Sequence, residues 1–83
     1  MKVHIHVSLK PGVLDSQGRA IHHKLETLGF EGVNDVRAGK LIELDVDSDV
    51  TDETLDQMCR KLLANMVIEN YRIERMEPIE ETA

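Results

Sequence analysis

Two histidines, His4 and His6, lie two positions apart near the start of the chain. On a β-strand this spacing points both imidazoles to the same side of the sheet, an arrangement that metal sites use. The other histidines, His22 and His23, belong to an expected helix whose exposed face points elsewhere. We therefore interpret His4 and His6 as surface or interface residues and predict no metal site.

An alternating acidic trio follows the middle of the chain, formed by Asp45, Asp47 and Asp49. Its spacing is that of the first ligands of a calcium loop, which also requires glycine at its sixth position and glutamate at its twelfth. The chain has Val50 and Asp56 there instead. We interpret the acidic run as a solvated sheet edge and a helix N-terminus, where negative charge is favourable, with a docking patch as the alternative.

The candidate nucleophiles lack surroundings that would activate them. Cys59 lies on the apolar stripe of an expected helix, and a buried thiol without nearby positive charge stays inert. Ser8 and Ser16 are not part of any motif that activates a hydroxyl group. We therefore predict no catalytic residue in this chain.

Three basic residues, Lys10, Arg37 and Lys40, flank expected turns of an otherwise acidic chain. Their common position next to turns indicates a local basic patch that a partner could contact. Ordinary solubilising charge is the alternative interpretation.

The composition restricts the class of protein. The 83 residues include 16 acidic and 10 basic ones, for a formal net charge of −6, which repels the phosphate backbone of nucleic acids. Phe30 and Tyr71 are the only aromatic residues, so the stacking platforms of single-strand binders are missing. A domain this small buries only about 60% of the surface of its unfolded chain, and association would improve its stability.

The sequence also indicates the compartment. Cys59 is the only cysteine, which excludes an intrachain disulfide and suits a reducing environment. Residues 1–9 alternate between polar and apolar side chains, unlike a signal peptide, and no stretch approaches the roughly 18 apolar residues of a membrane span. We expect a cytoplasmic protein with neither membrane nor nucleic acid as a partner.

The first half of the chain predicts a strand and a helix. Residues 2–9 alternate as a half-buried strand does, and Pro11 and Gly12 end it. Asp15 is placed to cap a helix that stops at Gly29. The apolar stripe of this helix consists of Leu14, Ile21, Leu25 and Leu28. Gly18 inside the helix costs about 1 kcal/mol relative to alanine, which indicates close packing against another backbone there.

The second half predicts three strands around a second helix. Residues 33–37 and 41–47 are expected to form a hairpin through Ala38-Gly39-Lys40. Thr51 or Asp52 can cap the next helix. Its apolar positions are Leu55, Met58, Cys59, Leu62 and Leu63. Residues 68–76 then form a strand with Tyr71 and Ile73 pointing inward.

The predicted order is therefore β-α-β-β-α-β, an α+β two-layer sandwich of ferredoxin-like order with an antiparallel sheet and both helices on one face. One domain of residues 1–77 is followed by a polar tail, residues 78–83. The opposite face stays open and carries Lys2, His4, His6, Leu41 and Glu43. Such a face favours covering by a second copy, as a dimer or a higher oligomer such as a tetramer.

Three segments, residues 9–20 (LKPGVLDSQGRA), 35–44 (DVRAGKLIEL) and 62–71 (LLANMVIENY), together resemble the PurS family. This family is the small subunit of phosphoribosylformylglycinamidine (FGAM) synthase, also called formylglycinamidine ribonucleotide synthase, in de novo purine biosynthesis. The resemblance implies a non-catalytic bridge between a large ATP-dependent synthetase subunit and a glutaminase subunit. Ammonia released from glutamine would pass to the synthetase, which uses ATP and Mg²⁺, while this chain itself holds no cofactor.

The resemblance also suggests which residues contact the partners. They are Lys10, Pro11, Gly12, Arg37, Gly39 and Lys40. Two alternatives share the predicted order of elements: a regulatory module of the ACT-like kind that binds small molecules, and a small enzyme of the acyl-phosphatase kind. Fold alone does not separate these alternatives from the PurS family.

Overall fold

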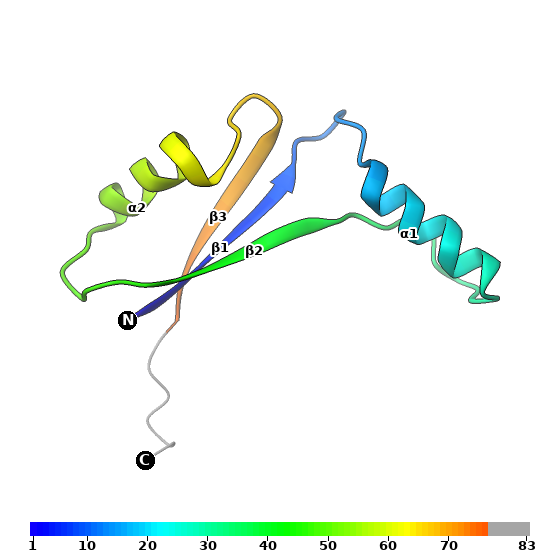
Figure 1. The fold of residues 1–83 in the computed structure, drawn as a ribbon, viewed down its shortest axis with the longest axis horizontal. Coiled ribbons are helices and arrows are strands. Elements are labelled where there is room, and N and C mark those ends of the chain that lie inside the picture. The colour runs from blue at the N-terminus through cyan, green and yellow to red at the C-terminus, as the bar shows by residue number, and fades with distance from the viewer. Residues whose placement is uncertain (77–83) are drawn as a thin grey trace, which may run out of the picture.

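The computed structural model describes residues 1–76. Its elements are β1 (Lys2–Leu9), α1 (Ser16–Thr27), β2 (Gly39–Asp45), α2 (Asp52–Met58), the π-helical turn η1 (Cys59–Leu63) and β3 (Glu69–Met76). The three strands form one antiparallel sheet in the order β2-β1-β3. Figure 1 shows α1 apart from the three strands, on the other side of the sheet in this view from α2.

The central strand β1 supplies the middle of the core. Val3 and Ile5 are fully buried and Val7 is 2% exposed, so the alternation of the sequence places every second side chain on one covered face. On that face Ile5 lies opposite Ile42 of β2 and Ile73 of β3. The predicted inward faces of these strands are confirmed.

Helix α2 and the turn η1 cover this face of the sheet. Leu55 and Cys59 are fully buried, and Ala64 is 7% exposed. The amide of Ala64 donates to the carbonyl of Cys59 at 2.9 Å, an i→i+5 bond that widens the last turn. The wider turn shifts the helical register, which explains why Leu62, predicted to face the core, is 82% exposed instead.

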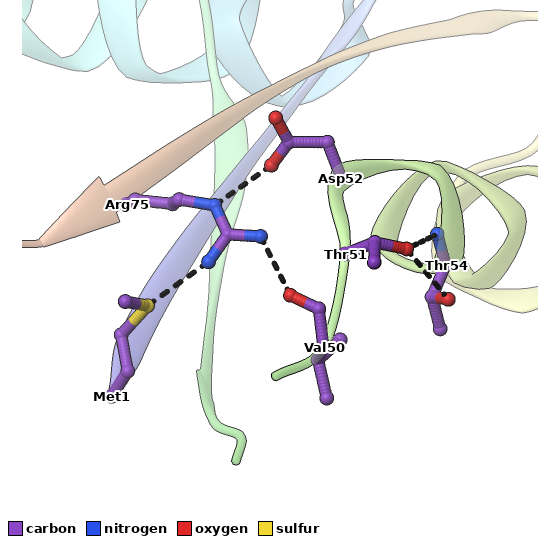
Figure 2. Close-up of polar contacts among 6 residues, drawn as sticks. All are labelled: Met1, Val50, Thr51, Asp52, Thr54 and Arg75. Carbon is purple, nitrogen blue, oxygen red and sulfur yellow. Dashed lines mark hydrogen bonds and ion pairs between the residues drawn. The ribbon is translucent and has the colours of Figure 1, made fainter. Parts of the chain in front are cut away.

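Hydrogen bonds join the start of α2 to the end of β3 (Figure 2). Arg75 donates from Nε to Asp52 Oδ1 at 2.7 Å and from Nη2 to the carbonyl of Val50 at 2.8 Å. Thr51 caps the helix, as its Oγ1 accepts from the amide of Thr54 at 3.2 Å. One arginine therefore fixes where α2 begins on the sheet.

The predicted hairpin of residues 33–37 and 41–47 is wrong. Of its two expected strands only the second forms, as β2, and the order of elements within the described residues is β-α-β-α-β. Residues 33–37 run back along α1 instead. The carbonyl of Val33 lies 2.8 Å from His22 Nε2. The amide of Ala38 donates to Asp15 Oδ2 at 2.7 Å. These polar contacts replace the ladder that a hairpin would have supplied.

The antiparallel sheet with its two helices confirms the α+β class, but α1 extends beyond the sheet in the single chain (Figure 1). We call α1 and its return segment, together residues 13–38, the α1 arm. Its apolar side chains face outward: Leu14 is 63%, Leu28 62% and Phe30 58% exposed. The radius of gyration of the Cα atoms is 16.5 Å, whereas a compact chain of this length has about 12 Å.

The face of the sheet away from α2 carries the side chains predicted for an open face, including Lys2, His4 and His6. Leu41 on this face is 54% exposed. None of the helices found within residues 1–76 has the length and apolar character that crossing a membrane requires. The predicted tail of residues 78–83 lies outside the described residues, so the domain boundary at residue 77 stays a prediction.

Candidate protein-binding interface

The interface residues expected from the sequence lie together at one end of the sheet, where β1 ends and β2 begins. They are Lys10, Pro11, Gly12, Arg37, Gly39 and Lys40. The amide of Lys10 donates to the carbonyl of Ile68 at 2.8 Å, and its carbonyl accepts from the amide of Val13 at 3.1 Å. Gly12 has a φ of +88°, which closes the turn in a conformation that disfavours other residues.

Gly39 opens β2 and does not form the tight reversal that the sequence predicted, because no hairpin exists here. It pairs with Ser8 across the ladder. A Cβ at this position would lie 2.6 Å from the carbonyl oxygen of Val7. Glycine is therefore required for β2 to start this close to β1.

Three cations surround this end of the sheet. Arg37 donates from Nη2 to the carbonyl of Leu9 at 3.0 Å, which holds its guanidinium beside the end of β1. Lys10 is half-buried, and Arg37 and Lys40 are exposed. In residues 1–76 none of the three takes part in an ion pair. The cluster, here called the basic end, therefore presents positive charge on a chain with a net charge of −6.

A buried carboxylate lies beneath the basic end. Asp15 is 9% exposed, and its two oxygens accept from the amides of Gly18 at 2.8 Å and Ala38 at 2.7 Å. The bond from Ala38, and secondly that from Gly18, lowers the pKa of the Asp15 carboxyl. The cap on α1 was predicted from the sequence. The hydrogen bond from Ala38 to Asp15 was not, because it joins residues 23 positions apart and neighbouring residues do not indicate it.

A shallow hollow of about 290 Å³ separates the start of α1 from the basic end. Leu14 and Asp15 line one side, and Gly39, Lys40 and Glu69 line the other. Ser8 and Ser16, the candidate hydroxyl nucleophiles of the sequence, also line this hollow, and its lining holds no histidine that could act as their base.

The one cysteine is enclosed in the core, as its position on the apolar stripe predicted. Cys59 is fully buried. Burial, and secondly the negative charge of Asp56, raises the pKa of the Cys59 thiol. Because the thiolate is the reactive form, this setting makes Cys59 inert.

On the open face, His4 and His6 each contact a glutamate. His4 Nε2 lies 3.0 Å from Glu43 Oε2, and His6 Nε2 lies 2.8 Å from Glu74 Oε1. Sequence reasoning missed Glu74. The signal that could have found it is the register of β1 with β3, which sets Glu74 opposite His4.

The model of the PurS family, described as phosphoribosylformylglycinamidine (FGAM) synthase, matches residues 2–77. The chain belongs to the PurS family. The phosphoribosylformylglycinamidine synthase subunit PurS of Bacillus subtilis is 48% identical over 82 residues, which cover 94% of this chain and 95% of the relative. The match extends over both the basic end and the α1 arm.

Solved structures agree with this assignment. A structure of Bacillus subtilis PurS has a TM-score of 0.81 at 50% identity, covering 92% of this chain and 98% of that one. A chain in the structure of PurLQS from Thermotoga maritima has a TM-score of 0.77 at 30% identity, covering 90% of this chain and 95% of that one. The PurS assignment is therefore favoured over the ACT-like alternative.

Proposed function

We propose that this chain is the non-catalytic small subunit of FGAM synthase in purine biosynthesis. It joins the ATP-dependent synthetase subunit to the glutaminase subunit and supports the transfer of ammonia between them. The observation that carries this proposal is the similarity over 90% of the chain to a component of the PurLQS assembly. The synthetase subunit uses ATP and Mg²⁺, this chain needs no cofactor, and the complex works in the cytoplasm.

The basic end is the proposed contact with the partner subunits. Lys10, Arg37 and Lys40 are positive side chains without ion pairs among the described residues, and charge of one sign steers a partner of the opposite sign. Gly12 and Gly39 are both exposed at this end of the sheet. An acidic or polar partner surface fits this end of the sheet.

The test reverses charge at the basic end. Lys10→Glu combined with Lys40→Glu is expected to weaken co-purification with the two partner subunits about tenfold or more, since neither lysine forms an ion pair within residues 1–76. Glutamine-dependent FGAM synthesis should fall, whereas synthesis supported by added ammonium should survive, because it needs no glutaminase. Lys61→Glu, an exposed charge reversal on η1, is the matched control.

An equal loss of both activities in Lys10→Glu/Lys40→Glu would contradict the bridging role, because a bridge matters only when ammonia must come from glutamine. Turnover of any substrate by the purified chain alone would contradict the non-catalytic role. Tight binding of an amino acid in calorimetric titration would support the ACT-like alternative instead.

We also propose that a second copy covers the α1 arm. The three outward apolar side chains Leu14, Leu28 and Phe30 are each more than half exposed, although burying one such side chain gains about 1.5–3 kcal/mol. Within residues 1–76, α1 lies beyond the sheet and is not covered by its strands (Figure 1). A copy of the same chain brings an equal apolar stripe, which a two-fold interface requires.

Self-association is tested by Leu28→Ser and Phe30→Ser in sedimentation velocity. Each variant should raise the dissociation constant of the homo-oligomer by tenfold or more while leaving the circular dichroism spectrum of the chain unchanged. Glu31→Ser, an exposed polar change next to Phe30, is the control. A wild-type chain that stays monomeric at high micromolar concentration would refute the proposal.

A further inference from the structure

We infer that the open face of the sheet holds a binding site for a divalent transition-metal ion, formed by His4, His6 and Glu74. Each of the three side chains offers one ligand atom, and these atoms all lie within 4.8 Å of one another. His4 and His6 come from β1 and Glu74 from β3, opposite His4 in the ladder. Two imidazoles and one carboxylate are a donor set that zinc uses in proteins.

The spacing is close to what a metal requires. With bonds of about 2.0–2.1 Å in a tetrahedral site, two ligand atoms are about 3.4 Å apart. His6 Nε2 and Glu74 Oε1 are already 2.8 Å apart. A metal would replace the proton that these two atoms share, and the ring of His4 would have to approach by no more than about 1.5 Å. Side-chain rotation supplies such a movement without a change of the backbone.

A second carboxylate orients one of the ligands. Glu43 Oε2 lies 3.0 Å from His4 Nε2. If His4 coordinates through Nδ1, its Nε2 proton can be donated to Glu43, and metal-bound histidines usually have such a carboxylate partner.

The proposed site is accessible to solvent, and its three ligands are held by paired strands. The side chains of His4, His6 and Glu74 are 20%, 36% and 44% exposed. All three come from paired strands, which hold ligands more rigidly than loops do. Within residues 1–76, Arg72 Nη1 lies 4.0 Å from Glu74 Oε1, and the Arg72 side chain is 65% exposed, so it can move into solvent when an ion binds.

The test uses the full chain, stripped of metal with a chelator, and Zn²⁺ as the probe. Calorimetric titration is expected to show one Zn²⁺ per chain. Titration with Co²⁺ should give the visible absorption bands of a tetrahedral site, a readout that surface binding through one histidine does not produce. His4→Gln, His6→Gln and Glu74→Gln should each lower the affinity at least tenfold, and Glu43→Gln about tenfold.

His23→Gln is the matched control, because this exposed histidine on α1 is remote from the sheet face and the substitution should leave binding unchanged. Circular dichroism of each variant verifies that it is folded. Two results would overturn the inference: no stoichiometric binding of Zn²⁺ by the wild-type chain, or equal binding by the His4→Gln/His6→Gln variant. Neither result bears on the bridging role, which depends on other residues.

Discussion

Replacing Gly18 by alanine tests how the α1 arm is built, because helix propensity and packing predict opposite signs. In a helix interior, alanine is more favourable than glycine by about 1 kcal/mol. At Gly18 a Cβ would lie 2.5 Å from the carbonyl oxygen of Val36 and 2.6 Å from Asp15 Oδ2. Ordinary contact begins at 3.4 Å, so the return segment must move outward by almost 1 Å.

The packing effect should dominate. Overpacking of this kind costs about 1–3 kcal/mol, and here one neighbour is backbone and the other is a buried carboxylate whose two hydrogen bonds depend on its position. After the propensity gain is subtracted, Gly18→Ala should lower the free energy of unfolding by about 1 kcal/mol. For a chain of this size that corresponds to a fall in Tm of about 4–8 °C.

The assay is urea unfolding followed by circular dichroism, at one fixed chain concentration because association contributes to apparent stability. Gln17→Ala is the control, since Gln17 is the exposed neighbour on the same helix and should gain a few tenths of a kcal/mol. If Gly18→Ala instead stabilises the protein by the full 1 kcal/mol, the close approach of the return segment to α1 is wrong.

Three further predictions concern the core and its titrating groups. Leu55→Ala, at a fully buried position, should cost about 2–5 kcal/mol in urea unfolding, and a loss below 1 kcal/mol would contradict its place in the core. Cys59 should react with a thiol reagent only at the rate of unfolding, and labelling at the rate of a free thiol would show that it is not enclosed. Tyr71 and secondly Arg60 lower the pKa of Asp56 through hydrogen bonds, so its contribution to stability is complete above its ordinary pKa of 3.8 and is lost as the pH falls through the lowered value. Asp56→Asn should therefore flatten the loss of stability below about pH 4, and an unchanged acid slope would refute this.

The features that the sequence predicted well are those set by neighbouring residues. The alternation of residues 2–9 predicts a buried face at Val3 and Ile5 because a strand has no other way to hide every second side chain. Asp15 caps its helix as expected, since the geometry of a cap involves only the next three residues. Gly18 inside the helix predicted close packing against another backbone segment, and the carbonyl oxygen of Val36 lies at that place.

The wrong predictions concern segments whose structure depends on residues that are not their immediate neighbours in the sequence. Residues 33–37 have the composition of a strand, but Asp15 and His22, which lie 11 to 23 positions earlier, take up polar groups along the return segment. Leu62 was predicted to face the core by counting 3.6 residues per turn. The π-helical turn inserts a longer step between Cys59 and Ala64, so the count fails there.

The basic end and the histidine pair likewise combine features that the sequence predicts with features that depend on the register of the strands. Its members, such as Lys10 and Lys40, were selected as residues next to turns and through the family resemblance, and the structure brings them together because β2 begins where β1 ends. The histidine pair was recognised from its spacing, but its carboxylate partners Glu43 and Glu74 depend on the register of three strands, which a single sequence does not specify.

The α1 arm is fixed internally although its outer side is uncovered, and this combination bears on how the chain assembles. Asp15 joins the start of α1 to Ala38, and His22 joins its middle to Val33, so the arm keeps its shape without a partner. An interface that is already ordered loses little conformational entropy on binding, and more of the apolar burial then appears as affinity. Breaking the internal contacts, as in Gly18→Ala, should therefore weaken self-association even though Gly18 itself is buried within the arm.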